Sequence, residues 1–159
     1  MPVPVPPSAA PHAVAAADQP FHWPIRVYYE DTDAGGVVFY ANYLGFMERA
    51  RTEWLRALGF EQPEMAASDG VLFVVSAVNI KYLKPSRFND SLQVTVEVVN
   101  VGGSRIRFLQ QVLRGNEEIA RAEVAVVCVS TDTLRPARMP DGLRITIEEK
   151  MERETGTQN

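Results

Sequence analysis

The sequence predicts a single α+β domain in which an antiparallel sheet packs against one long helix. Apolar side chains between residues 44 and 58 recur at three- and four-residue spacing, which is typical of an amphipathic helix. Four later segments either alternate apolar and polar residues or are apolar throughout, as strands do. Turns of hairpin type separate the last three of these segments. A sheet with one apolar face has to bury that face, and a helix laid across it does so.

The elements follow one another along the chain. Residues 1–20 are rich in Pro and Ala with little that could pack, so we expect a disordered extension. Aromatic and β-branched residues over 26–29 predict a strand. The long helix is predicted to begin within 39–42 and to end at Gly59, and residues 61–70 form a connection with helical tendency.

The later strands are predicted over residues 71–83, 92–98, 105–112 and 119–129. Residues 84–90 between the first two form a turn, because they contain Pro, Ser and an Asn-Asp pair. We therefore expect a folded domain over residues 21–145 and a charged C-terminal tail over 146–159.

Composition excludes several functional classes. The chain has 159 residues, 46% hydrophobic and 23% charged, which suits one soluble domain. A net charge of −4 gives no basic footprint for nucleic acid, and no stretch is long and apolar enough to cross a membrane. No Lys or Arg precedes Arg26, so no signal peptide is expected. The single cysteine, Cys128, lies in an apolar strand pattern, which predicts a buried thiol and a reducing, cytoplasmic location.

The two histidines restrict the chemistry further. His12 and His22 both lie ahead of the predicted strand over 26–29 and of all later elements, so a Ser-His-Asp or Cys-His arrangement is not expected in the core. A zinc site built on histidine is excluded for the same reason. Hydrolytic chemistry in this chain would therefore depend on carboxylates, water and backbone dipoles.

The turn over residues 30–36 combines three carboxylates with a Gly-Gly pair directly ahead of the long helix. The first N–H groups of a helix have no internal partners and bind anions readily. One interpretation is an acid beside backbone donors, which can attack a carbonyl. The other is that Asp31 and Asp33 only cap the turn and favour the helix dipole. Spacing alone does not distinguish them.

Three segments resemble a known family. These are YYEDTDAGGVV over residues 28–38, Asn42-Tyr43, and ERARTE over residues 48–53. They are similar to the hot-dog-fold acyl-CoA thioesterases, above all the Tol-Pal-associated (YbgC-like) branch, which is related to 4-hydroxybenzoyl-CoA thioesterase. The likeness covers residues 23–140. It implies a hot-dog fold, with an antiparallel sheet wrapped around one central helix, and hydrolysis of an acyl thioester to a carboxylate and a thiol.

The resemblance also assigns roles. The catalytic acid of the family falls on Asp33, as nucleophile or as general base, while Asp31 caps the turn. A backbone N–H near Tyr40 would polarise the thioester carbonyl. The YbgC-like branch often has His where this chain has Tyr40, whereas 4-hydroxybenzoyl-CoA thioesterase has Tyr, so the acyl preference stays open.

Substrate-binding positions follow from the same motifs. Candidates for substrate contact are Gly36, Val37, Tyr43, Glu48, Ser104 and Arg105. By its position in the resemblance, Arg105 would bind the phosphates of coenzyme A, with Arg107 and Lys84 as further candidates. Exposed arginines on strands are, however, commonly just solvated. Glu48 is the second candidate carboxylate, but its i,i+3 spacing from Arg51 predicts an ordinary ion pair.

The resemblance implies an enzyme that needs no metal or other cofactor, since coenzyme A is part of the substrate. It also implies a homotetramer built as a dimer of dimers, and an acyl carrier protein is a compatible partner. A hot-dog module that binds acyl-CoA or acyl carrier protein without cleavage is the alternative. A hot-dog dehydratase would require a histidine near its acid, which the predicted body lacks.

Overall fold

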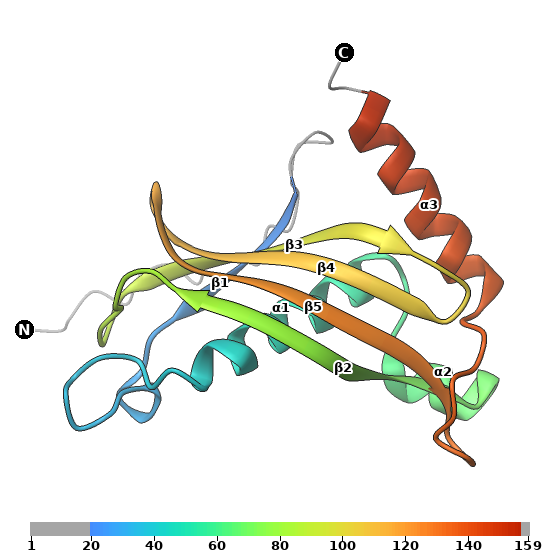
Figure 1. Cartoon of the computed structure of the whole chain (residues 1–159), viewed down its shortest axis with the longest axis horizontal. Coiled ribbons are helices and arrows are strands. Elements are labelled where there is room, and N and C mark those ends of the chain that lie inside the picture. Colours follow the sequence, from blue (N-terminus) through green and yellow to red (C-terminus); the bar gives the residue numbers. More distant parts are fainter. Residues whose placement is uncertain (1–19, 157–159) are drawn as a thin grey trace, which may run out of the picture.

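A five-stranded antiparallel sheet wraps around one helix in the computed structural model, which describes residues 20–156 (Figure 1). The strands are β1 (Phe21–Arg26), β2 (Val71–Tyr82), β3 (Ser91–Val101), β4 (Arg105–Arg114) and β5 (Glu117–Ser130). The helices are η1 (Tyr29–Asp31), α1 (Asn42–Ala57), α2 (Gln62–Asp69) and α3 (Asp141–Gly156). The strand order is β1-β3-β4-β5-β2, so β1 and β2 form the two edges.

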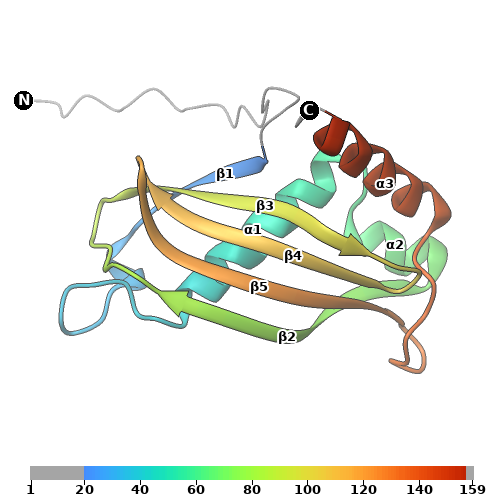
Figure 2. The same ribbon diagram turned by 45° about the horizontal axis from the view of Figure 1, so that its top comes forward.

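Helix α1 fills the concave side of the sheet, as both ribbon views show (Figures 1 and 2). Its apolar stripe is buried, with Met47 and Ala50 fully inaccessible, and Trp54 packs edge-on against Phe108 of β4 at a centroid distance of 5.2 Å. Burying an aromatic pair of this kind contributes both apolar area and a favourable edge-to-face contact. The helix ends as expected, because Gly59 adopts a φ of +92°, which terminates the helical path.

The first strand differs from the prediction. Strand β1 spans Phe21–Arg26 rather than 26–29, and it includes His22, which therefore lies inside the folded body. The chain leaves the sheet at Tyr28, because the Asp31 carboxylate accepts the Tyr28 N–H at 2.8 Å and starts the short helix η1. The carboxylate of Asp31 thus takes the place of the backbone carbonyl that the Tyr28 N–H would have bonded in a longer strand.

The later elements agree with the alternation in the sequence. Strands β2, β3, β4 and β5 overlap the four predicted strands, and the connection over 61–70 forms helix α2. Cys128 is buried in β5, where burial raises the pKa of its thiol, as expected for a structural cysteine. The expected extension over residues 1–20 lies outside the described residues apart from Pro20.

The two edges of the sheet differ in character. Strand β1 is short and carries Pro24, which lacks a backbone N–H for pairing. Strand β2 is twice as long, and apolar side chains in its middle are exposed, with Val75 at 47% and Val78 at 40%. Long exposed apolar edges are uncommon in monomers, because they invite pairing with another chain.

The C-terminal segment is part of the fold. Helix α3 runs without interruption across residue 145, and Leu143 and Ile147 on its inner side are buried in the core. Figure 2 shows the helix lying against one end of the sheet. The folded domain therefore does not end at residue 145 as expected. Ile147, which lies in the segment predicted as a tail, packs on the core.

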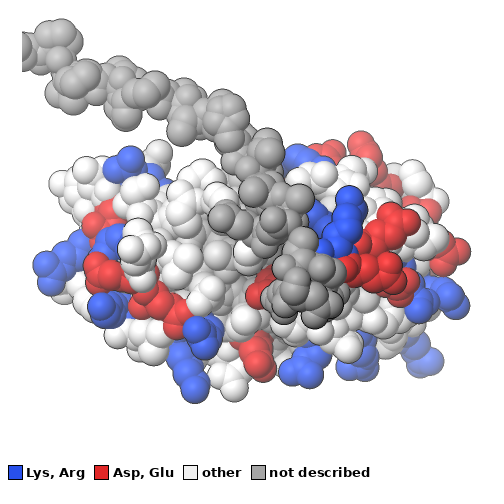
Figure 3. Space-filling model, turned by 90° about the horizontal axis from the view of Figure 1, so that it is seen from above, with Lys and Arg blue, Asp and Glu red and all other residues white. Residues whose placement is uncertain are grey.

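Surface charge is mixed on the face seen in Figure 3, where acidic and basic side chains are interspersed around an uncharged area. Such a distribution gives no single-signed field over this face. Among the helices of residues 20–156, none has the length and hydropathy needed to span a membrane.

Candidate active site

A closed turn presents the carboxylate of Asp33. The Asp33 N–H donates to the carbonyl of Val37 at 2.9 Å, and the Gly36 N–H donates to the carbonyl of Asp33 at 3.0 Å. Gly36 has a φ of +78°, which an L side chain rarely adopts. One carboxylate oxygen, Oδ1, accepts the Gly35 N–H at 2.8 Å, and the side chain is exposed. The turn therefore fixes Oδ1, while Oδ2 accepts no hydrogen bond from the residues that the structure describes.

Asp31 supports this turn. Its carboxylate accepts the Tyr28 N–H, and its carbonyl accepts the Phe39 N–H at 2.9 Å and the Asn42 Nδ2–H at 2.8 Å. These bonds connect η1 to the first residue of α1. Asp31 therefore connects η1 to the start of α1, whereas the carboxylate of Asp33 accepts a hydrogen bond, among the described residues, only from within its own turn.

The start of α1 offers unsatisfied backbone donors. No side chain caps this helix, and neither the Tyr40 N–H nor the Ala41 N–H has an acceptor within the described part of the chain. The ring of Tyr40 is 62% exposed and contacts Tyr82 edge-on at 6.0 Å. Unsatisfied donors at the positive end of a helix dipole can stabilise an oxyanion.

A second turn, over residues 84–90, holds the first one in place. The Ser86 carbonyl accepts the Val38 N–H at 2.8 Å, and its buried hydroxyl lies 2.5 Å from the hydroxyl of Tyr43. Burial raises the pKa of Tyr43, so this pair remains neutral. Tyr43 is 3% exposed and turned into the core, so its hydroxyl is structural rather than offered to a ligand.

Ser86 is the residue that sequence reasoning missed. Its position in a Pro-Ser-Arg turn predicts only a loop. The one available signal was Tyr43 on the inner face of the helix, since a buried tyrosine hydroxyl needs a partner.

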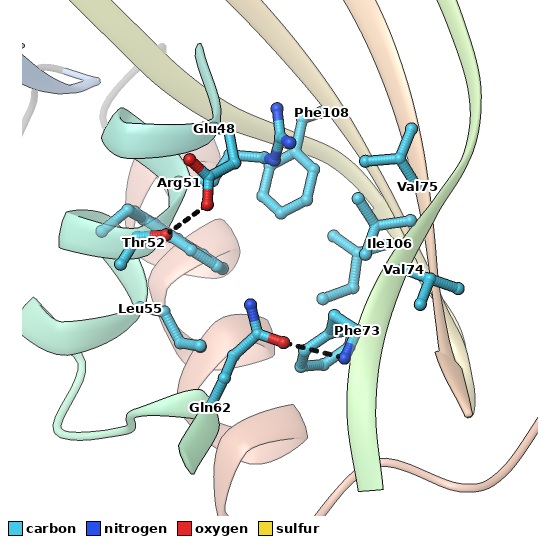
Figure 4. A pocket seen from close by; sticks show the side chains of 12 residues that line it. Glu48, Arg51, Thr52, Leu55, Gln62, Phe73, Val74, Val75, Ile106 and Phe108 are labelled. Atoms are coloured by element: carbon cyan, nitrogen blue, oxygen red, sulfur yellow. Dashed lines mark hydrogen bonds between the residues drawn. The ribbon is translucent and has the colours of Figure 1, made fainter. Parts of the chain in front are cut away.

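A pocket of about 150 Å³ lies between α1 and β2 (Figure 4). Glu48, Arg51 and Thr52 line it from α1, while Phe73 and Val75 of β2 form the opposite wall. The remaining lining residues are Trp54, Leu55, Gln62, Val74, Ile106, Phe108 and Val126. The pocket is largely apolar, with its charged groups gathered on the helix side.

The expected ion pair between Glu48 and Arg51 does not form. Arg51 turns inward instead, and its Nη1–H donates to Oε1 of the buried Gln110 at 2.8 Å. Glu48 is exposed and accepts a hydrogen bond from the Thr52 hydroxyl at 3.3 Å. Both side chains therefore face the pocket separately.

The predicted phosphate contacts, Ser104 and Arg105, lie far from the turn that carries Asp33. Ser104 lies in the turn before β4, and Arg105 is the first residue of β4. Arg105 and Val74 both pair with Val127 of β5, so they lie at the same height of the sheet. The Tyr40 end of the site adjoins Tyr82, eight residues further along β2. At about 3.3 Å per residue, this separation is roughly 26 Å. A single chain therefore does not bring Arg105 together with the turn of Asp33.

An antiparallel sheet wrapped around a central helix defines a hot-dog-fold protein, and the carboxylate turn ahead of that helix is its candidate site. The chain belongs to the thioesterase-like superfamily, whose family profile matches residues 27–147. This membership confirms the resemblance and the fold expected from the motifs.

Several relatives are similar over most of the chain. The acyl-CoA thioester hydrolase YbgC of Escherichia coli is 43% identical over 124 residues, which is 77% of this chain and 92% of that protein. The acyl-CoA thioesterase YbgC of Haemophilus influenzae is 44% identical over 123 residues, covering 77% and 90% respectively.

Solved structures of other proteins share this fold. A probable thioesterase from Bartonella henselae superposes with a TM-score of 0.74 at 31% identity and covers 77% of this chain and all of that one. A hypothetical protein from Staphylococcus aureus in complex with CoA has a TM-score of 0.80 at 16% identity, covering 88% of this chain and 89% of its own, and this likeness concerns the fold alone.

Proposed function

We propose that this protein hydrolyses acyl-CoA thioesters to a carboxylate and free coenzyme A, using Asp33 and a backbone N–H at the start of α1. The observation that carries the proposal is an exposed carboxylate, held by Gly35, directly ahead of a helix whose N–H donors at Tyr40 and Ala41 lack acceptors in the described chain. The names of the YbgC relatives support the same activity.

The chemistry requires two contributions. The Tyr40 N–H accommodates the negative charge that develops on the thioester oxygen. Oδ2 of Asp33 then either attacks the carbonyl carbon, giving an anhydride and a thiolate, or takes a proton from the water that attacks. In the first case water cleaves the anhydride and restores the carboxylate. In both cases the sulfur leaves as coenzyme A thiolate. It takes up a proton from water in the first case and from the carboxyl group of Asp33 in the second, which restores the carboxylate, and no further cofactor is needed.

We further propose that two copies of the chain pair through the β2 edges. A two-fold axis across antiparallel β2 strands sets the Val71 end of one strand beside the Tyr82 end of the other. This arrangement would bring Arg105 of the second copy toward the turn of Asp33, where it could bind coenzyme A phosphates. The exposed apolar side chains of Val75 and Val78 support the pairing.

The direct test is thiol release from a panel of acyl-CoAs by wild type and by Asp33→Asn. The change keeps size and hydrogen bonding but removes the charge. We expect kcat to fall at least a hundredfold while substrate binding persists. Glu30→Gln is the matched control, because Glu30 is an exposed carboxylate in the same turn, and it should retain activity.

Two results would contradict the proposal. If Asp33→Asn stays active, the catalytic assignment fails and Glu48 becomes the carboxylate to test. If wild type binds acyl-CoA without releasing thiol, the protein is a binding module rather than a hydrolase.

A further inference from the structure

Arg51 is a cation without an anionic partner in a mostly apolar pocket. Its guanidinium is partly buried, and its one hydrogen bond within residues 20–156 goes to the neutral side chain of Gln110. Burial lowers the pKa of Arg51, and the charge of Glu48 offsets this effect only partly. Of the five N–H groups of an arginine, all but one therefore lack an acceptor in the described chain. These N–H groups are accessible rather than sealed in the interior, since Oε1 of Gln93 is the one buried side-chain N or O atom without a partner among the described residues. A ligand that enters the pocket can therefore supply an acceptor for them.

Gln110 fixes where Arg51 points. Its Nε2 donates to the carbonyls of Met47 at 3.0 Å and Thr95 at 3.3 Å, and its side chain is fully buried. With both amide hydrogens directed to backbone oxygens, Oε1 is the atom left to accept from Arg51. The guanidinium is therefore oriented before any ligand enters, which reduces the entropic cost of binding.

Glu48 lies one helical turn before Arg51 and lines the same pocket, yet no ion pair joins the two side chains. The carboxylate of Glu48, an acceptor, and the N–H donors of Arg51 thus face the same pocket without contacting each other. A hydroxyl group satisfies both, because its oxygen accepts from Arg51 while its hydrogen is donated to Glu48. A carboxylate would instead set a second negative charge beside Glu48, which is unfavourable.

We propose that Arg51 and Glu48 form a subsite for a hydroxyl group on the acyl chain of the substrate, so that hydroxylated acyl-CoAs are preferred over unsubstituted ones. This inference rests on the proposed function. Walls formed by Leu55, Phe73 and Ile106 take the hydrocarbon part. A cavity of about 150 Å³ is large enough for a benzene-sized group. Arg51 lies about 14 Å along the helix axis from Asn42, so the position of the hydroxyl on the chain is best found with a length series.

The kinetic test compares acyl-CoAs of increasing length with their terminally hydroxylated counterparts. In wild type, the best hydroxylated substrate should exceed its unsubstituted match in kcat/KM by about tenfold, since a hydrogen bond to a charged group discriminates on this scale. Arg51→Met and Glu48→Leu should each bring the ratio close to one. Arg49→Met is the matched control, because Arg49 is exposed on the same helix, and it should preserve the ratio.

The inference is overturned if wild type shows no preference at any length, if Arg51→Met preserves the preference, or if carboxylate-ended chains are the better substrates. Thermal unfolding of each variant verifies that it is folded. If Arg51→Met does not fold, Glu48→Leu takes its place as the test, because it changes an exposed residue.

A binding measurement separates this inference from the proposed function. Trp54 lines the pocket, and the chain contains 2 tryptophans, so Trp23→Phe leaves Trp54 as the only indole. Thioether analogues of coenzyme A, which cannot be hydrolysed, can then be titrated against Trp54 fluorescence. Tighter binding of the hydroxyalkyl thioether, lost in Arg51→Met, supports the subsite even if no thioester is cleaved. Equal binding of the hydroxyalkyl and alkyl thioethers contradicts it even if hydrolysis is observed.

Discussion

The hydroxyl groups of Tyr43 and Ser86 lie 2.5 Å apart in the protein interior, and this contact joins α1 to the turn over residues 84–90. The carbonyl of Ser86 in the same turn accepts the Val38 N–H, and Val38 directly follows Val37, whose carbonyl accepts the Asp33 N–H. The candidate catalytic turn is thus supported from the core by one buried hydrogen bond.

Tyr43→Phe should lower the free energy of unfolding by about 1–3 kcal/mol, because it leaves the buried Ser86 hydroxyl unpaired. Ser86→Ala should have a similar effect, and the double variant should be little worse than either, as expected for partners in one bond. Urea titrations measure all three. Tyr29→Phe, which changes a 73% exposed ring, is the control. Additive losses would contradict a shared bond.

The pH dependence of stability should include a contribution from Tyr43. Burial raises the pKa of Tyr43 in the folded state above the ordinary value for a tyrosine, so the folded protein retains a proton that the unfolded chain loses. The contribution is complete below about pH 10 and disappears as the pH rises through the folded-state pKa. Urea titrations from pH 8 upward should therefore show a decline that is shallower in Tyr43→Phe. Equal slopes would contradict this assignment.

Gly35→Ala should reduce activity more than stability. A Cβ at this position would lie 3.2 Å from Oδ1 of Asp33, so the carboxylate must shift by a few tenths of an ångström. Small displacements of reacting groups are costly, and we expect kcat to fall several-fold. Gly103→Ala is the control, since its Cβ would meet no atom within 4 Å. Unchanged kcat in Gly35→Ala would show that the orientation of Asp33 is not critical.

Val78→Glu should weaken self-association if the β2 edges pair. A carboxylate at the centre of an apolar strand would meet its own copy across a two-fold axis. Sedimentation should show a shift to smaller species, with thiol release falling in parallel. Val99→Glu is the matched control, because Val99 is 48% exposed and lies on β3, away from the β2 edge. If both variants keep the wild-type size, the interface lies elsewhere.

Ile147→Ala should destabilise the protein by about 2–5 kcal/mol, because it removes a core side chain that is 1% exposed. Ile145→Ala changes a side chain that is 52% exposed on the same helix and should cost at most about 0.5 kcal/mol. Thermal unfolding measures the difference. Equal effects would mean that α3 contributes little to the core in solution.

Local periodicity predicted most of the fold. The spacing of Met47, Ala50 and Trp54 placed α1, and the alternation of later segments placed four strands. The sequence did not predict that helix α3 packs on the core, because charged residues separate its apolar ones. Leu143 and Ile147 are nonetheless one helical turn apart, which is the relevant signal.

Long-range contacts account for what the sequence could not predict. Tyr43 is separated from Ser86 by 43 residues, and Arg51 from Gln110 by 59. In the second case the spacing of Glu48 and Arg51 favoured an ion pair, but a buried amide 59 residues away competes for the guanidinium. Local spacing describes what side chains can reach within one helix, and only tertiary packing decides which partner they take.

The unlike edges of the sheet have a consequence for assembly size. Pairing through β2 consumes the long, open edge of each chain, and the outer edges of the joined sheet are then both β1. Each β1 is short and interrupted by Pro24, which offers no N–H to an incoming strand. If the β2 edges pair as proposed, strand addition would therefore end after two chains, because neither remaining edge favours a further strand.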